Sequence, residues 1–267
     1  MAQRSLLFVP GSRPDRFEKA LAASADLICI DLEDAVSPDQ KESARSATCD
    51  WLTQRDDIST ACVRINPPGT DLGSADLDAL AKVPGLSLLM IPKVTTPDQV
   101  EAVATRFPTV RLIALIESPV GVIAAPAIAA ARGVKALMFG GADFSAEMGC
   151  EMTWEPLLAA RGQLALAAAS CSIGLIDVPY LDVTDNAGLE QETRAVRSMG
   201  FTAKAAIHPA QVSTINAVFS PSPAQLEWAR SVVDAVGGDE NLIAVVNGKF
   251  IDRPVILQAR HILAQSD

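Results

Sequence analysis

Short, almost continuously apolar runs recur along the chain, and longer segments with helical spacing of apolar positions separate them. Runs that are apolar at nearly every position are typical of strands buried on both faces of a parallel sheet. The pattern therefore predicts an alternation of strands and helices. The predicted strands are eight: Ser5–Val9, Leu27–Leu32, Ala61–Ile65, Ser87–Ile91, Leu112–Ile116, Ala136–Phe139, Leu175–Val178 and Ala203–Ile207.

Several segments between these runs begin with a serine or threonine followed closely by proline. A hydroxyl side chain caps the first free N–H groups of a helix, and proline fits its first position. This signature predicts helices at Pro14–Ala23, Pro38–Trp51, Pro97–Thr105 and Pro119–Ala131. Repeated β/α alternation without a shift in composition favours a closed barrel over an open sheet. We predict an α/β fold, a (β/α)8 TIM barrel, as the catalytic domain at residues 1–219.

The pattern changes after the last predicted strand. The serine–proline stretch Ser220–Pro223 predicts a hinge. Beyond it the sequence predicts a helix, a glycine break, a short apolar segment, a turn and a last helix, at Ala224–Val236, Gly237–Gly238, Leu242–Val246, Asn247–Gly248 and from Pro254 onward. We predict that residues 220–267 form a C-terminal helical arm outside the barrel.

Charge and cysteine content narrow the function classes. A net charge of −10 and a pI near 4.7 argue against binding to nucleic acid or to anionic membranes, because both need a basic surface. The five cysteines are an odd number without a C-x-x-C pair, which is typical of reduced thiols rather than a disulfide framework. No apolar stretch reaches the roughly 18 to 20 residues of a membrane span, and no secretion signal is evident. We expect a cytoplasmic protein without nucleic-acid or membrane partners.

Charged and polar residues follow most of the predicted strands. In a barrel enzyme these carboxyl ends of the strands form the active site. Charges beside buried strands are costly unless they are paired, bind a metal or line a cavity. We therefore expect one pocket lined by the residues at these ends, which are Asp31, Glu33, Asp34, Arg64, Asn66, Lys93, Glu117, Asp143 and His208.

Glu117 and Asp143 follow consecutive predicted strands, so their Cα atoms should lie within about 5 to 10 Å of each other. Two carboxylates without a nearby histidine or cysteine ligand are typical of a hard-cation site. Mg²⁺ is one such cation, which takes one or two carboxylates and completes its coordination with water and substrate oxygens. Gly140 and Gly141 would allow close approach of a ligand to the backbone. Alternatively, each carboxylate only caps the helix that follows it.

The other strand-end charges allow two interpretations each. Arg64 is a candidate anchor for a substrate carboxylate, or it forms an internal ion pair. Asp31, Glu33 and Asp34 are candidate acceptors for metal-bound waters, and Lys41 joins them there or pairs with them structurally. Lys93 raises the possibility of a Schiff base, which a metal site would make redundant. His208 is either a base or a wall of the pocket.

Seven segments, in order, are similar to the citrate lyase beta-subunit-like proteins. These belong to the aldolase/citrate lyase superfamily, which includes malyl-CoA and citramalyl-CoA lyases. The segments are RSLLFVPG at 4–11, IDLEDAV at 30–36, VRIN at 63–66, IPK at 91–93, LIES at 115–118, GGADF at 140–144 and AIHP at 206–209. The resemblance implies a TIM barrel, Mg²⁺ and a keto-acid pocket beside a CoA thioester site.

The resemblance also implies roles for individual residues. Glu117 and Asp143 would bind the metal, and Arg64 would bind the substrate carboxylate. The segment at 248–254 resembles one that supplies a catalytic aspartate to a neighbouring subunit, which here is Asp252. Such an arm requires a homo-oligomer, which we expect to be a trimer or hexamer. We also assign Pro119, Gly141 and Ala142 to the substrate pocket.

These residues predict a Mg²⁺-dependent carbon–carbon lyase. Its substrate would be a 3-hydroxy-3-carboxy acyl-CoA of the citramalyl-CoA or malyl-CoA type, cleaved to acetyl-CoA and a 2-keto acid such as oxaloacetate, pyruvate or glyoxylate, or formed from them. A first alternative is a citryl-thioester lyase that acts as the beta subunit of citrate lyase, with a carrier-protein thioester. A second is a subunit that binds metal and keto acid without catalysis of its own.

Overall fold

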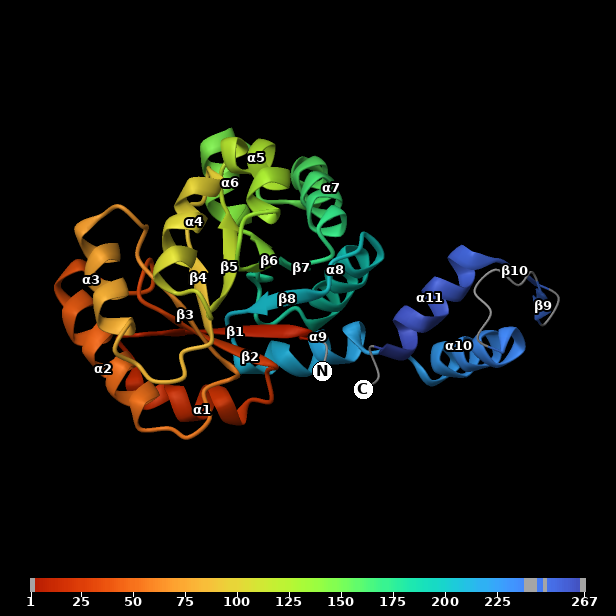
Figure 1. Ribbon diagram of the computed structural model, residues 1–267, viewed down its shortest axis with the longest axis horizontal. Coiled ribbons are helices and arrows are strands. Elements are labelled where there is room, and N and C mark those ends of the chain that lie inside the picture. Colours follow the sequence, from red (N-terminus) through yellow and green to blue (C-terminus); the bar gives the residue numbers. More distant parts are fainter. Residues whose placement is uncertain (1–2, 238–243, 247–248, 265–267) are drawn as a thin grey trace.

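The computed structural model describes residues 3–237, 244–246 and 249–264. Within these ranges eight parallel strands form a closed barrel, because β8 pairs with β1 (Figure 1). This confirms the predicted TIM-barrel fold. The strands are β1 (Ser5–Pro10), β2 (Leu27–Asp31), β3 (Ala61–Arg64), β4 (Leu88–Ile91), β5 (Arg111–Ile116), β6 (Val134–Phe139), β7 (Gly174–Asp177) and β8 (Ala203–Ala206).

Two apolar layers hold the barrel together. Side chains alternate along a strand, so one set fills the interior and the other faces the surrounding helices. Leu6, Cys29 and Met138 belong to the inner layer, while Leu7 and Ile28 pack in the layer shared with the helices. Because both faces of each strand are buried, the strands are apolar at nearly every position, as the sequence pattern indicated. The five cysteines are free thiols.

Helices surround the barrel and connect its strands (Figure 1). Within the described ranges none is both long and apolar enough to cross a membrane. The barrel helices are α1 (Phe17–Ala22), α2 (Lys41–Thr53), α3 (Asp71–Leu80), α4 (Pro97–Arg106), α5 (Pro119–Ala129), α6 (Gly141–Met148), α7 (Trp154–Ser170), α8 (Asn186–Ser198) and α9 (Val212–Phe219).

All four predicted helical segments begin at the predicted proline, but only two of them begin as α-helices. α5 begins at Pro119, and the Ser118 hydroxyl accepts a hydrogen bond from the Gly121 N–H at 3.0 Å; α4 likewise begins at Pro97. At Pro14 and Pro38 the first turn is a 3-10 helix, Pro14–Arg16 and Pro38–Gln40, and α1 and α2 follow directly from Phe17 and Lys41. There the N–H donates three residues back, as from Gln40 to the Ser37 carbonyl at 3.0 Å, and no side chain caps the turn.

The C-terminal region projects from the barrel as an arm (Figure 1). Helices α10 (Pro223–Val236) and α11 (Arg253–Ala264) pack on each other, and β9 (Ala244–Val246) pairs antiparallel with β10 (Lys249–Ile251). The arm has an apolar cluster of its own, which includes Val232 and Ile256. Gly237 ends α10 with a left-handed φ of 55°. The remaining predicted features, at Gly238, Leu242–Ile243 and the Asn247–Gly248 turn, lie outside the described residues.

Candidate active site

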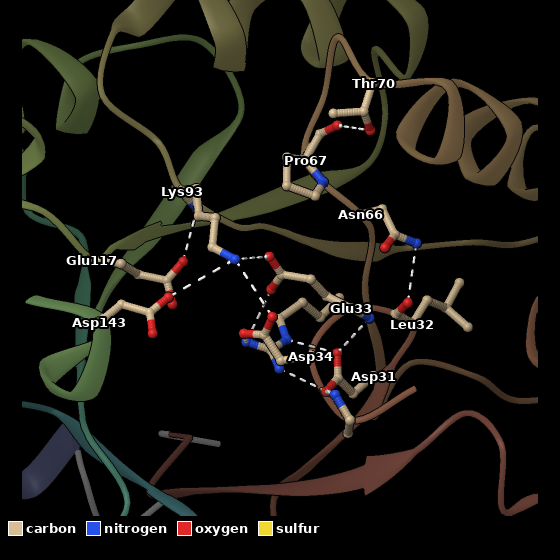
Figure 2. A network of polar contacts seen from close by, with 12 residues as sticks. Asp31, Leu32, Glu33, Asp34, Asn66, Pro67, Thr70, Lys93, Glu117 and Asp143 are labelled. Atoms are coloured by element: carbon tan, nitrogen blue, oxygen red, sulfur yellow. Dashed lines mark hydrogen bonds and ion pairs between the residues drawn. The ribbon is translucent and has the colours of Figure 1, made fainter. Parts of the chain in front are cut away.

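Seven charged residues from the ends of β2 to β6 lie together at the mouth of the barrel (Figure 2). The strands are parallel, so all their carboxyl ends reach the same rim. We call these residues the mouth cluster. Five carboxylates and two cations form it: Asp31, Glu33, Asp34, Glu117 and Asp143 with Arg64 and Lys93. The excess of negative charge favours the binding of an additional cation.

Arg64 is held by a bidentate ion pair with Asp31. Its Nε and Nη2 lie 2.7 and 2.6 Å from the two Asp31 oxygens, and its Nη1 lies 3.2 Å from Glu33. Burial lowers the pKa of Arg64, but the hydrogen bonds and charge of Asp31 outweigh this effect and raise the pKa above its ordinary value. The internal ion pair considered from the sequence is therefore present. Nη1 is the guanidinium nitrogen that does not bond Asp31, and it is ion-paired with Glu33, so its binding of a substrate carboxylate stays a prediction.

Lys41 contacts neutral oxygens rather than carboxylates. Its Nζ donates to the carbonyls of Leu32 and Glu33 at 2.7 and 2.6 Å and to Oδ1 of Asn66 at 2.8 Å. These bonds join the chain just after β2 to the chain just after β3. Lys41 thus fixes the backbone on which Glu33 and Asp34 are placed.

Glu117 is the most strongly perturbed carboxyl group of the mouth cluster. Only 7% of the residue is exposed, and its Oε2 accepts a hydrogen bond from the Lys93 backbone N–H at 2.8 Å. Burial, followed by the charges of Glu33 and Asp143, raises the pKa of Glu117 to about 8. A carboxyl group of this kind binds a proton at neutral pH unless a cation stabilises its ionised form.

The glycines before Asp143 make room for neighbouring side chains. A Cβ on Gly140 would lie 2.8 Å from Oε1 of Glu117, and one on Gly141 would lie 2.9 Å from Cγ1 of Val178. The missing side chains therefore accommodate the protein's own residues, and the close approach of a ligand to this backbone stays a prediction. The prediction that Gly141 and Ala142 contact substrate depends instead on N–H groups in the first turn of α6, which have no intrahelical acceptor.

Glu33 and Asp143 lie on either side of the Lys93 ammonium (Figure 2). Glu33 is 3% exposed, and in the described part of the chain its carboxylate has ion pairs with Arg64 and Lys93 but no further hydrogen-bond donor. Burial raises its pKa. Asp143 lies in the first turn of α6, and its side chain is 47% exposed. One of the two carboxylates is therefore buried and the other open to solvent.

The residues present fit a magnesium site. Glu117 and Asp143 offer hard carboxylate oxygens, and burial of Glu117 disfavours its charged form unless a cation lies beside it. Within the described ranges no group of three or more acidic, histidine or cysteine side chains is arranged to hold a metal. A Mg²⁺ site does not need such a group, because one or two carboxylates suffice when waters or substrate complete the octahedron.

The remaining predicted site residues lie at different distances from the mouth cluster. Pro119 begins α5 directly after Glu117 and Ser118. His208 is exposed, and its Nδ1 accepts a hydrogen bond from the Ala210 N–H at 3.2 Å, so the ring caps the turn that follows β8. Asp252 precedes α11 in the projecting arm, where it accepts a bond from the Val255 N–H. The structure does not bring Asp252 to the mouth cluster of its own chain.

A second group of buried charges was not predicted from the sequence. Four residues form this group, which we call the inner cluster: Arg161 on α7, Asp177 on β7, Glu192 on α8 and Lys204 on β8. Lys204 Nζ donates to Asp177 and Glu192 at 2.6 and 2.7 Å, and both residues of the Asp177–Lys204 pair are fully buried. A lysine inside an otherwise apolar strand was the available signal, because such a charge needs a buried partner.

The chain is similar to known proteins in sequence and in structure. Residues 4–209 match the HpcH/HpaI aldolase/citrate lyase family. The chain is 37% identical to a (3S)-malyl-CoA thioesterase of Cereibacter sphaeroides, over 99% of this chain and 94% of that protein. It is 30% identical to the mitochondrial citramalyl-CoA lyase of Homo sapiens, over 97% and 84%. A crystal structure of CitE from Mycobacterium tuberculosis with magnesium, acetoacetate and coenzyme A superposes with a TM-score of 0.86 at 33% identity, over 99% and 98%.

Proposed function

The chain belongs to the HpcH/HpaI aldolase/citrate lyase family, and we propose that it is a Mg²⁺-dependent carbon–carbon lyase acting on a 3-hydroxy-3-carboxy acyl-CoA. Malyl-CoA and citramalyl-CoA are substrates of this type. The products would be acetyl-CoA and a 2-keto acid, glyoxylate or pyruvate respectively, and the same site would serve the reverse reaction.

One observation carries the proposal. Glu117 and Asp143 lie at the mouth of the barrel in a cluster with more carboxylates than cations, and burial raises the pKa of Glu117 to about 8. A bound metal cation would supply the missing positive charge. A CitE structure that covers 99% of this chain contains magnesium, acetoacetate and coenzyme A, and another contains magnesium and pyruvate, a 2-keto acid. These ligands support a metal, a keto acid and a CoA thioester in the proposed reaction.

The proposed reaction breaks the bond between the hydroxyl-bearing carbon and the adjacent methylene carbon. The hydroxyl gives its proton to water and becomes the keto group, and the bonding electrons pass to the methylene carbon of the acetyl-CoA fragment. That carbon takes up a proton to become the methyl group. When bound, Mg²⁺ supplies Lewis-acid stabilisation of the oxygen that becomes the keto group. Glu117 and Asp143 would hold the metal, and Arg64 Nη1 would orient the substrate carboxylate.

We assign the proton transfer at carbon to Asp252 of a second copy of the chain. Asp252 lies on the arm that projects from the barrel (Figure 1), and nothing in the described part of its own chain brings it to the mouth cluster. A homo-oligomer would let the arm of one copy complete the site of another. The carboxyl group would donate its proton in cleavage and remove one in condensation.

Product identification tests the proposed activity. Purified protein with Mg²⁺ is incubated with malyl-CoA and with citramalyl-CoA, and keto acid, acetyl-CoA and free thiol are measured separately. Formation of keto acid together with acetyl-CoA is the expected result. Hydrolysis would instead release free CoA without keto acid, and this is the second candidate function, favoured by 37% identity to a protein named malyl-CoA thioesterase. Turnover of a citryl thioester alone, or binding of keto acid without turnover, would favour the two remaining alternatives.

Mixing two inactive variants tests the role of Asp252. Glu117→Ala and Asp252→Asn are each expected to lose turnover as homo-oligomers. Mixed oligomers contain sites that combine an intact Glu117 with an intact Asp252 from the other variant, so part of the activity should return. No recovery in oligomers shown to be mixed, or full activity of Asp252→Asn alone, would contradict the assignment.

A further inference from the structure

Lys93 has an unusual backbone conformation at the end of β4. Its φ is 54°, and among the described residues only two other non-glycine residues, Ser24 and Ser172, share a positive φ. L residues seldom adopt this left-handed conformation, and it persists where the surroundings fix it. Here it directs the Lys93 N–H towards Oε2 of Glu117, at 2.8 Å. The backbone of Lys93 therefore places a proposed metal ligand.

The side chain of the same residue extends into the mouth cluster. Its Nζ lies 2.8 Å from Oε1 of Glu33, 3.4 Å from Oδ1 of Asp34 and 3.9 Å from Oδ2 of Asp143 (Figure 2). These carboxylates come from the ends of β2 and β6, on either side of the mouth. In the part of the chain that the structure describes, Lys93 is the one cation paired with both Glu33 and Asp143.

We propose that Lys93 is an internal counter-ion of the metal site, which neutralises Asp143 and Glu33 while the metal is absent and moves away when Mg²⁺ binds. Its side chain would then set the affinity for the metal, while its backbone N–H keeps Glu117 in place in both states. This inference rests on the proposed ligation of the metal by Glu117 and Asp143.

The Lys93 ammonium and a bound Mg²⁺ would compete for the same carboxylates, because like charges repel. A magnesium ion bound to Asp143 would lie about 2.0 to 2.1 Å from its oxygen. An ammonium group 3.9 Å from the same side chain would stand close to a doubly charged ion, and repulsion at such separations is strong in a partly buried site. The Lys93 side chain is 44% exposed and Asp34 is 54% exposed. The ammonium can therefore move towards Asp34 and solvent without disrupting packed residues.

The same contacts disfavour a Schiff base at Lys93. A nucleophilic lysine must lose its proton, and such residues lie in apolar pockets or beside other cations. Three carboxylates surround the Lys93 ammonium and stabilise its charged form. The residue is suited to neutralising charge, so we assign it a positioning role.

Metal titration tests the proposal without relying on catalysis. The affinities of wild type, Lys93→Met and Lys93→Arg for Mg²⁺ are measured by calorimetry, with Mn²⁺ electron paramagnetic resonance as an independent readout. Lys93→Met removes the competing charge but retains the backbone N–H, and we expect it to bind Mg²⁺ about ten-fold more tightly or better. Lys93→Arg keeps the charge and should bind no more tightly than wild type.

Lys135→Met is the matched control, because Lys135 is exposed near the start of β6, at the opposite end of the barrel. It changes the net charge equally and should leave the affinity unchanged. Affinity of Lys93→Met that is equal to this control, or weaker than wild type, would overturn the proposal. Failure of the wild-type chain to bind Mg²⁺, or undiminished binding by Glu117→Ala, would instead contradict the proposed metal site. The two failures are therefore distinguishable.

Discussion

The barrel contains two groups of buried charges that differ in how completely they are neutralised. In the inner cluster, two cations meet two carboxylates, and Lys204 donates to Asp177, Glu192 and the carbonyl of Val178. Nη1 of Arg161 is the exception, since it is buried and has no hydrogen-bond partner among the described residues. In the mouth cluster carboxylates outnumber cations, and burial raises the pKa values of Glu33 and Glu117.

This difference separates a structural charge group from a ligand site. A paired group satisfies its members within the fold and has little affinity left for a ligand. A group with unneutralised carboxylates at a barrel mouth is poised to bind a cation. Burial alone does not distinguish the two clusters, because Asp177 and Glu33 are both almost fully buried. The balance of charges does.

The largest expected effect is on turnover, from Glu117→Ala in the mouth cluster. Losing one of two metal ligands should lower kcat/KM by about 1000-fold and abolish Mg²⁺ binding at the same time, because both depend on the same carboxylate. Thermal unfolding without metal should change little or improve. Steady-state kinetics and calorimetry measure the two losses. Loss of turnover with normal metal binding would contradict ligation by Glu117.

Substituting lysine by methionine in each cluster tests the comparison directly. Lys204→Met leaves Asp177 buried beside a single cation, and we expect a loss of about 3 to 5 kcal/mol in the free energy of unfolding. Lys93→Met removes a side chain that is 44% exposed, so its loss should be much smaller. Urea unfolding of both variants, without metal, gives the two values. Equal losses would show that the clusters do not differ in structural role.

The two clusters should also respond oppositely to pH. The pKa of Glu117 is raised from 4.5 to about 8 by burial, so between these values the folded chain holds a proton that the unfolded chain has lost. Stability should therefore fall as the pH rises from 5 to 9, by an amount on the order of a few kcal/mol. Unfolding of the metal-free protein across this range measures it. Glu117→Gln should reduce the fall and leave the share that comes from Glu33, whose pKa is also raised; a wild type without the fall would contradict the raised pKa of Glu117.

Asp177 contributes with the opposite sign. Burial acts to raise its pKa, but the charges of Lys204 and Arg161 outweigh burial and lower it. The stability that its ionised form provides is present above the ordinary carboxyl range and is lost as the pH falls through the lowered pKa. Acid unfolding should accordingly begin at higher pH in Lys204→Met than in wild type, whereas Glu117→Gln should not shift it upward.

A smaller effect is expected from Gly140→Ala, which alters the placement of Glu117 without removing its carboxylate. The added methyl group would lie 2.8 Å from Oε1 of Glu117, so the side chain must move. We expect Mg²⁺ binding to weaken by about 10- to 100-fold, the range seen when supporting groups of a metal site are lost. Gly162→Ala on α7 is the control, because a Cβ there has open space around it. Equal metal affinities would show that Glu117 tolerates displacement.

Much of the fold could be predicted because it depends on local sequence patterns that recur along the chain. Strands buried on both faces must be apolar at nearly every position, and a capping serine or threonine followed by proline marks the start of a helix. At Pro14 and Pro38 the pattern placed the helix starts correctly but did not show that the first turn is a 3-10 helix rather than an α-helix. Proline with a nearby serine is compatible with a 3-10 turn as well as with a capped α-helix.

The sequence determined the barrel and the charged ends of its strands, because periodicity fixes which residues are buried and parallel strands share one rim. Glu117 and Asp143 could be named from that pattern as candidate metal ligands, and the family resemblance favoured this interpretation over two helix caps. Only the tertiary structure decided that Arg64 is already paired with Asp31, that Gly140 makes room for Glu117, and that Lys93 lies among the carboxylates. These contacts join residues far apart in the chain. They depend on strand register and on one left-handed φ, and neither is encoded by the spacing of residues along the chain.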